Sequence, residues 1–438
     1  MLGVLVSLLS LLMVSGIWGE SLIWVLASSG LLMMTSSDSL IWKSGLIGEL
    51  DFIGWGLSLL SMWIVLLSVL GSKSIKNSKN LCALFVILSI SLLFLFVVSF
   101  YVGDFMLFYI GYESCLIPIF FLILGWGYQP ERAQAGIYML FYTLFGSLPL
   151  FFLIIKGSSL GCWYMHSLFM TWPKSWVFYI FLIGAFLVKF PMYSVHLWLL
   201  KAHVEAPVAG SMVLAGVMLK LGGYGLTRFL AFWWAGVNWL SEIILCLSVW
   251  GAVAVSLSCL RQMDMKLLIA SSSVVHMSMC IGGLLILSEW GLKGVMGLMV
   301  AHGLCSSGLF YLANMVYERT GSRSLVMNKG LLSIMPSMSF WWFALLSANM
   351  AAPPSLNLFG EILLIVILVS WSKVLMVVIS LLSFFSAAYS LYLFSLSQHG
   401  VYLMNNSGFH SGFIVEYLVA SSHWLPLNIM ILCLFWFV

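Results

Sequence analysis

The stretch LVKFPMYSVHLWLLKAHVEAP, residues 187–207, places a cation and a helix breaker inside an apolar run long enough to cross a bilayer. Lys189 is followed two positions later by Pro191. Proline lacks the backbone N–H and clashes with the carbonyl four residues back, so it opens a helix. A lysine at the centre of a membrane helix costs about 2.5–3.5 kcal/mol on insertion scales. The pattern therefore predicts an interrupted membrane helix that holds a functional lysine, with an ordinary proline kink as the alternative.

The composition predicts an integral membrane protein. Of the 438 residues, 63% are hydrophobic and only 7% are charged, whereas a globular domain carries roughly 25% charged residues. The net charge of +4 is too small to indicate nucleic-acid binding. The eight cysteines follow no metal-ligand spacing. We therefore expect no zinc, haem or iron–sulfur site and no cofactor in this chain.

Apolar runs predict the fold class. A hydrocarbon core about 30 Å thick requires about 20 apolar residues per helix, and without an alternating strand pattern the spans are helices. We expect an all-α polytopic membrane protein with about 14 transmembrane helices. The runs are 1–19, 21–36, 53–70, 80–102, 104–127, 135–155, 175–200, 207–227, 239–260, 265–288, 292–317, 337–371, 374–397 and 415–438. The run 337–371 contains Pro353-Pro354 and is expected to be interrupted.

Basic residues in the expected loops predict the orientation. The side that holds loop 71–79 has ten cations, namely Lys73, Lys76, Lys79, Arg132, Lys201, Arg261, Lys266, Arg319, Arg323 and Lys329. The opposite side has six, namely Lys43, Lys156, Lys174, Arg228, Lys293 and Lys373. Loops rich in basic residues stay on the cytoplasmic side of a membrane, which corresponds to the matrix side in mitochondria. We therefore expect the side that holds loop 71–79 to face the cytoplasm or matrix, and both termini to lie on the opposite side.

Several ionisable groups lie at similar depth inside the runs. They are Glu113, Lys189, Lys220, Glu361, His276 and His302. A rise of about 1.5 Å per residue places Glu113 roughly 14 Å from the start of its run, close to mid-bilayer. Since each buried charge is costly, chance does not account for four of them. Histidine and a buried lysine with a movable carboxylate partner can change charge near neutral pH, whereas arginine cannot, so the set predicts a proton relay.

Each group also has a structural alternative. Lys189 and Glu113 can form a static ion pair that holds two helices together. Lys220 can extend toward the membrane surface, and Glu361 can merely orient the interrupted helix. The buried histidines, and His196 of the HLW triplet, can serve only as hydrogen-bonding groups between helices.

Four stretches of this sequence resemble one known family. They are GYESCLIPIFFLILGWGYQPERAQAGIYMLFYTLFGSLPL (111–150), LVKFPMYSVHLWLLKAHVEAPVAGSMVLAGVMLKLGGYG (187–225), HGLCSSGLFYLAN (302–314) and ANMAAPPSLNLFGE (348–361). In this order they resemble NADH-ubiquinone oxidoreductase chain 4, the antiporter-like subunit of mitochondrial respiratory complex I. The resemblance covers about residues 100–365.

The resemblance implies two inverted five-helix repeats, each with a broken helix. The expected domains are N-terminal helices (1–79), a first repeat (80–227), a second repeat (239–397) and a C-terminal helix (398–438). The resemblance also assigns roles to the buried groups. Glu113 and Lys189 match the functional pair, Lys220 the central lysine and Glu361 the acidic end of the second repeat, while His196, His276 and His302 match histidines of a polar axis. The sequence departs from the family at Leu200, where many members have proline.

The function implied is proton translocation across the inner mitochondrial membrane, driven by electron transfer from NADH to ubiquinone elsewhere in the complex. The expected route loads Lys189, passes through His276 or its neighbours to Lys220, and releases by way of Glu361. Other complex I subunits are the expected partners, with chains 2 and 5 as neighbours, and both termini face the intermembrane space. Two alternatives stay open: an independent monovalent cation/proton antiporter, and a scaffold whose charges only lock helices together.

Overall fold

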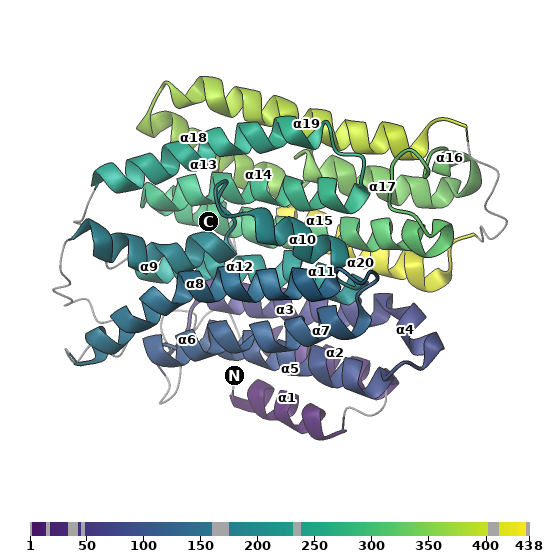
Figure 1. Cartoon of the computed structure of the whole chain (residues 1–438), viewed down its shortest axis with the longest axis horizontal. Coiled ribbons are helices and arrows are strands. Elements are labelled where there is room, and N and C mark those ends of the chain that lie inside the picture. The colour runs from purple at the N-terminus through teal and green to yellow at the C-terminus, as the bar shows by residue number, and fades with distance from the viewer. Residues whose placement is uncertain are drawn as a thin grey trace. The chain divides into compact units, whose positions relative to one another are not determined.

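The structure, a computed structural model, describes residues 2–14, 18–33, 43–44, 49–159, 175–230, 238–401 and 411–434. These residues are almost entirely helical, as expected (Figure 1). The exception is a short antiparallel ribbon, β1 (Lys43–Ser44) with β2 (Glu49–Leu50), which pairs Lys43 with Leu50. Nine helices in the described part of the chain are long and apolar enough to cross a membrane.

The helices divide into two compact units, and within each unit the long helices lie roughly parallel or antiparallel to one another (Figure 1). The first unit comprises residues 1–190 and 205–240, and the second comprises residues 191–204 and 241–438. The helices of the first unit are α1 (Leu2–Val14), α2 (Trp18–Met33), α3 (Phe52–Gly71), α4 (Lys73–Ser78), α5 (Cys82–Tyr101), α6 (Phe105–Ser114), α7 (Leu116–Trp126), α8 (Arg132–Ser159), α9 (Trp176–Lys189), α11 (Val208–Val213), the π-helix η2 (Leu214–Met218) and α12 (Leu219–Leu230). Those of the second unit are α10 (Leu197–Glu205, all but its last residue), α13 (Asn238–Cys259, from residue 241), α14 (Met265–Leu285), α15 (Glu289–Thr320), α16 (Leu331–Ile334), α17 (Pro336–Asn349), α18 (Leu356–Trp371), α19 (Leu375–Gln398) and α20 (Ile414–Leu432).

Both interruptions predicted from proline are present. Helix α9 ends at Lys189, and α10 begins only at Leu197, beyond Pro191. Helix α17 ends at Asn349, and α18 begins at Leu356, beyond the cis bond between Pro353 and Pro354. In each case the proline withholds the N–H that a continuous helix requires. The expected repeat and domain boundaries remain predictions.

Two further irregularities were not expected from the sequence. The run 104–127 is divided at Cys115 into α6 and α7. Pro118 explains this break, because its missing N–H leaves the carbonyl of Ser114 without its helical donor. The run 207–227 contains the π-helix Leu214–Met218 immediately before α12. Such π-helical turns are rare and frequently lie at functional sites.

Glycines bring the helices that carry the buried charges into close contact. A Cβ on Gly222 of α12 would stand 2.8 Å from the backbone nitrogen of Phe190, at the end of α9. In the second unit, a Cβ on Gly360 of α18 would stand 2.8 Å from the nitrogen of Leu298 on α15. Only glycine permits backbones to approach this closely. These contacts fix the level of Lys189 beside α12 and of Glu361 beside α15.

Two of the cations that we assigned to loops lie on helices with charge-stabilising contacts instead, Arg228 partly buried and Lys266 fully buried. Arg228 lies in α12, where it forms an ion pair with Asp51 and donates to the hydroxyl of Tyr224 at 3.1 Å. Lys266 lies in the first turn of α14 and is 2% exposed, with its Nζ 5.8 Å from the ring centroid of Tyr317. A buried cation needs an ion pair or a polarisable ring, and both residues have one.

Candidate functional site

Lys189 is the last residue of α9, and its side chain points into the first unit. The residue is 1% exposed. Its Nζ donates to the backbone carbonyl of Tyr112 at 2.5 Å and lies 3.1 Å from the centroid of the Tyr112 ring. The Tyr112 hydroxyl in turn donates to the carbonyl of Ala185 at 2.8 Å, one turn before Lys189. Among the residues that the structure describes, a carbonyl dipole and an aromatic face hold the ammonium group, and no direct salt bridge does.

Glu113 follows Tyr112 on α6, next to the break at Cys115. It interacts electrostatically with Lys189, and Ser147 of α8 faces the same carboxylate. Among the described residues, neither carboxylate oxygen of Glu113 has a hydrogen-bond partner, although both are shielded from solvent. A static ion pair would hold the two charges in contact with their hydrogen bonds satisfied. The carboxylate of Glu113 is instead buried within electrostatic reach of Lys189, without a direct salt bridge between them among the described residues.

Lys220 lies in the first turn of α12 and is fully buried. Its Nζ donates to the carbonyl of Ala215 at 2.6 Å. Ala215 belongs to the π-helix, whose wider turn displaces backbone carbonyls from the α-helical pattern. The side chain bends back toward the π-helical turn, so the structure does not support extension of Lys220 to the membrane surface.

The second unit brings together a histidine, a carboxylate and a tyrosine from three helices. Nδ1 of His276 on α14 lies 3.4 Å from Oε1 of Glu361 on α18. Nε2 of the same ring lies 3.4 Å from the hydroxyl of Tyr389 on α19. His276 is 2% exposed and Tyr389 is fully buried. We call these three residues the His276 cluster.

The His276 cluster accommodates both protonation states of the imidazole. In the neutral ring, Nδ1–H donates to Glu361 and Nε2 accepts from the tyrosine hydroxyl. In the imidazolium ion both nitrogens donate, and Tyr389 needs only to rotate its hydroxyl to accept from Nε2. One rotation of the Tyr389 hydroxyl therefore satisfies the hydrogen bonds of either state of the imidazole.

His302 and His196 have different positions relative to the His276 cluster. The ring of His302, on α15, is 5.6 Å from that of His276 between centroids, and its Nδ1 is 3.5 Å from the Ser306 hydroxyl. His302 thus adjoins the cluster. His196 lies just before α10, where it bonds to the carbonyl of Tyr193 and stacks on the Tyr193 ring at 5.6 Å. These local contacts agree with a structural role for His196.

The chemistry that the two sites support is proton transfer. One site consists of Lys189 with Glu113, and the other is the His276 cluster. Both contain groups that accept or donate protons within an apolar interior. No set of three or more histidine, cysteine or acidic side chains among the described residues is arranged to hold a metal ion. The sequence had indicated the charged residues but not the two tyrosines, because a buried tyrosine in an apolar run has no signal that separates it from core packing.

Comparison with known proteins agrees with this arrangement. A family model described as NADH:quinone oxidoreductase/Mrp antiporter, TM matches residues 102–386. The chain is 53% identical to NADH-ubiquinone oxidoreductase chain 4 of Ceratitis capitata over 394 residues, and 52% identical to that of Aedes aegypti over 396 residues. Each alignment covers 88% of both proteins.

A solved structure, respiratory complex I from Thermus thermophilus with bound NADH, contains a chain of similar fold. The TM-score is 0.86 at 23% identity, over 98% of this chain and 95% of that chain. At this identity the likeness concerns the fold alone. With relatives above 50% identity over most of its length and a family model across most of its helices, this chain belongs to the family of NADH-ubiquinone oxidoreductase chain 4.

Proposed function

We propose that this chain is a proton-translocating membrane-arm subunit of respiratory complex I, driven by electron transfer from NADH to ubiquinone elsewhere in the complex. The observation that carries the proposal is the His276 cluster, a buried imidazole between a carboxylate and a tyrosine hydroxyl. Glu113 and Lys189, which interact without direct contact, supply a second acid–base pair. Each proton moved against 100 mV costs about 2.3 kcal/mol, so such groups must be switched and not merely conducting.

The proposed route loads a proton at Lys189, passes it through Lys220 and releases it by way of His276 and Glu361. This order differs from the expected one, in which His276 preceded Lys220. The change follows from the contact of His276 with Glu361, which makes the histidine the natural donor to the release carboxylate. Lys220 keeps the central role that the family resemblance implies, with water as the proposed carrier of the proton between relay groups.

The surroundings of the chain follow from family membership and charge distribution. A complex I subunit with many apolar helices is a multi-pass protein of the inner mitochondrial membrane, in contact with other subunits of that complex. Chains 2 and 5 are the neighbours we propose. The excess of basic residues around α4 and at the start of α8 supports placing that side in the matrix and both termini toward the intermembrane space.

Replacing Lys220 with alanine tests the central step. We expect NADH-driven quinone reduction coupled to pumping to fall at least ~10-fold, since removal of a positioned proton-transfer group typically costs 10²–10⁴-fold. NADH oxidation by an artificial acceptor should stay at the wild-type rate. The matched control is Lys373→Ala, at an exposed lysine between α18 and α19. Loss of both activities in Lys220→Ala would indicate failed assembly, and full retention of both would contradict a relay through this residue.

Replacing Tyr389 with phenylalanine tests the His276 cluster. The change removes one hydrogen bond to His276, worth about 0.5–1.5 kcal/mol, so we expect coupled turnover to fall roughly 2- to 10-fold. Tyr392→Phe is the matched control, three residues later on the same helix, where the hydroxyl donates to the sulfur of Met263 at 3.9 Å. Turnover is measured as NADH-driven proton uptake or release in proteoliposomes. Equal turnover in the two variants would show that the Tyr389 hydroxyl takes no part in proton transfer.

An independent cation/proton antiporter makes a different prediction. In that case the purified chain alone would carry proton flux dependent on sodium or potassium in vesicles, without NADH or quinone. A complex I subunit should instead co-purify with NADH-oxidising activity, and its proton flux should stop when electron transfer is inhibited. Flux from the isolated chain that persists without electron transfer would overturn the proposed function.

A further inference from the structure

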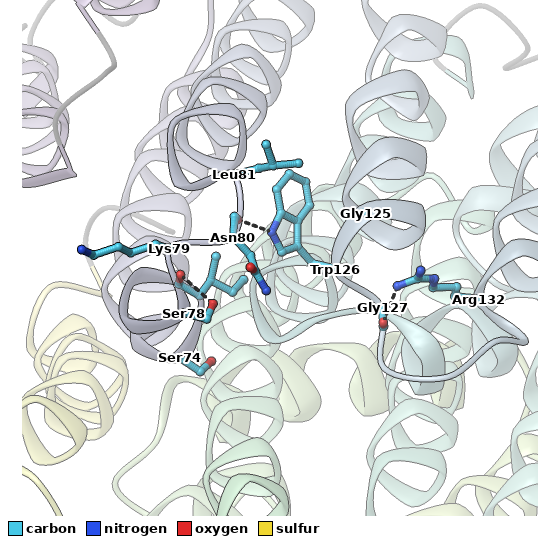
Figure 2. Close-up of a pocket in the computed structure, with 10 residues that line it drawn as sticks. Ser74, Ser78, Lys79, Asn80, Leu81, Gly125, Trp126, Gly127 and Arg132 are labelled. Atoms are coloured by element: carbon cyan, nitrogen blue, oxygen red, sulfur yellow. Dashed lines mark hydrogen bonds between the residues drawn. The ribbon is translucent and has the colours of Figure 1, made fainter.

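A pocket of about 760 Å³ opens at one end of the first unit, where α4 leads into α5 and α7 leads into α8 (Figure 2). It is separate from the buried sites described above. Its lining residues are Ser74, Ile75, Ser78, Lys79, Asn80, Leu81, Gly125, Trp126, Gly127 and Arg132. Two of them are cations and none is a carboxylate, so the pocket favours an anionic ligand.

The pocket is lined on both sides of Trp126. In Figure 2 Lys79 and Arg132 lie on opposite sides of the indole, and the Lys79 side chain extends away from it. The indole Nε1 donates to the carbonyl of Asn80 at 3.1 Å, which ties the end of α7 to the turn before α5. Arg132 donates from Nη1 to the carbonyl of Gly127 at 2.9 Å, and a guanidinium group carries further N–H donors beside this one. Lys79 is exposed, and its flexible stem lets the ammonium group move over the opening.

The pocket lies at the boundary between membrane and water. Helix α5, a candidate membrane span, begins at Cys82, and the span formed by α6 and α7 ends at Trp126. Tryptophan is enriched at this level of membrane proteins, where its ring meets the headgroups. Basic residues at the same level attract anionic lipids.

Exposed apolar side chains continue from the pocket along the spans. Leu81, in the lining, is 66% exposed, and Leu84, one turn further on α5, is 49% exposed. Phe121, one turn before Gly125 on α7, is 50% exposed. Residues four apart lie on one face of a helix, so Phe121 shares the face of Gly125 on α7, while Leu81 lies in the pocket lining just before α5 begins. A ligand with an anionic head and apolar chains would match both the cations of the pocket and the exposed apolar side chains beside it.

We propose that this pocket binds the phosphate of an anionic phospholipid, held between Lys79 and Arg132, with the acyl chains along the exposed faces of α5 and α7. A phospholipid supplies phosphate and chains together. Free phosphate would use the cations alone, and an acidic protein segment would leave the apolar faces uncovered. The site is independent of the proton relay and stands whether or not the proposed function holds.

The test measures lipid occupancy in the intact complex. The purified complex is placed in phosphatidylcholine vesicles that contain a photoactivatable phosphatidylglycerol tracer, and labelling of residues 74–81 and 125–132 is quantified by mass spectrometry after illumination. We expect Lys79→Gln to reduce this labelling about fivefold, which corresponds to ~1 kcal/mol. Lys79→Arg should restore it. The matched control is Lys76→Gln, an exposed lysine of α4 outside the lining, which should change labelling of the pocket less than twofold.

Three results would overturn the proposal. The first is equal labelling in wild type and Lys79→Gln. The second is displacement of the tracer by inorganic phosphate as efficiently as by unlabelled phosphatidylglycerol, which would identify a free-anion site. The third is a carboxylate–amine cross-link from Lys79 to another subunit together with absent lipid labelling, which would identify an acidic protein segment as the occupant.

Discussion

Lys189→Met is expected to reduce quinone reduction coupled to pumping at least ~10-fold while the complex still assembles, because the group that accepts the proton is gone but its volume is retained. Methionine has a similar unbranched stem and needs no partner for a charge. The substitution removes the ammonium that contacts the carbonyl and ring of Tyr112, and it removes the charge that acts on Glu113. Burial of a neutral side chain at this position carries no desolvation penalty, so stability should be preserved or slightly increased.

The measurement compares three activities of the Lys189→Met complex with those of wild type. They are NADH-driven quinone reduction, proton pumping in sealed proteoliposomes, and NADH oxidation by an artificial acceptor as an index of assembly. Lys373→Met, at the exposed lysine between α18 and α19, is the matched control and should behave as wild type. Normal pumping in a normally assembled Lys189→Met complex would support the scaffold alternative, in which the charges only lock helices.

Glu361→Gln is the second substitution with a large expected effect. The amide keeps an oxygen that can accept from Nδ1–H of His276, at the position where Oε1 now lies 3.4 Å away, but it cannot take up the proton. We therefore expect the His276 cluster to keep its geometry while coupled turnover falls at least ~10-fold. A role in merely orienting the interrupted helix would survive the change, since the glutamine is nearly isosteric with glutamate.

The control for Glu361→Gln is Glu242→Gln on α13, where the side chain is exposed. Proton release is followed with a pH-sensitive dye in proteoliposomes, alongside the rate of quinone reduction. Wild-type proton release in Glu361→Gln would exclude this carboxylate from the release step. If quinone reduction and artificial-acceptor oxidation both disappear, the complex has failed to assemble, and Glu361→Asp then serves as the variant that keeps the acid.

The sequence predicts the helices and their two proline interruptions because both signals are local. An apolar run of sufficient length has no other stable conformation in a bilayer, and proline withholds a donor wherever it stands. The break at Cys115 is also local in origin, since Pro118 accounts for it, but a proline near the start of a helix is often tolerated without a break. The π-helix before Lys220 has no such signal, because its turn depends on packing around the helix.

The partners of the buried charges are harder to predict than the charges themselves. A helix that is apolar on every side gives no indication of the face it presents to each neighbour. Neither the tyrosine at 112 nor that at 389 could therefore be assigned to Lys189 or His276 from spacing. Arg228 was assigned to a loop because its apolar run was taken to end at residue 227, and its partner Asp51 lies far away in the sequence, so only the fold brings the two together.

Substituting arginine for Lys189 tests most directly whether protonation, and not charge alone, is what this position supplies. Arginine keeps a positive charge beside Tyr112 and Glu113 but does not release its proton. The measurement is the number of protons pumped per NADH oxidised by assembled complexes in sealed proteoliposomes. A relay predicts that this ratio, or the coupled rate itself, collapses in Lys189→Arg as it does in Lys189→Met. A wild-type ratio at a wild-type rate would mean that a permanent cation suffices there, and translocation through Lys189 would be contradicted.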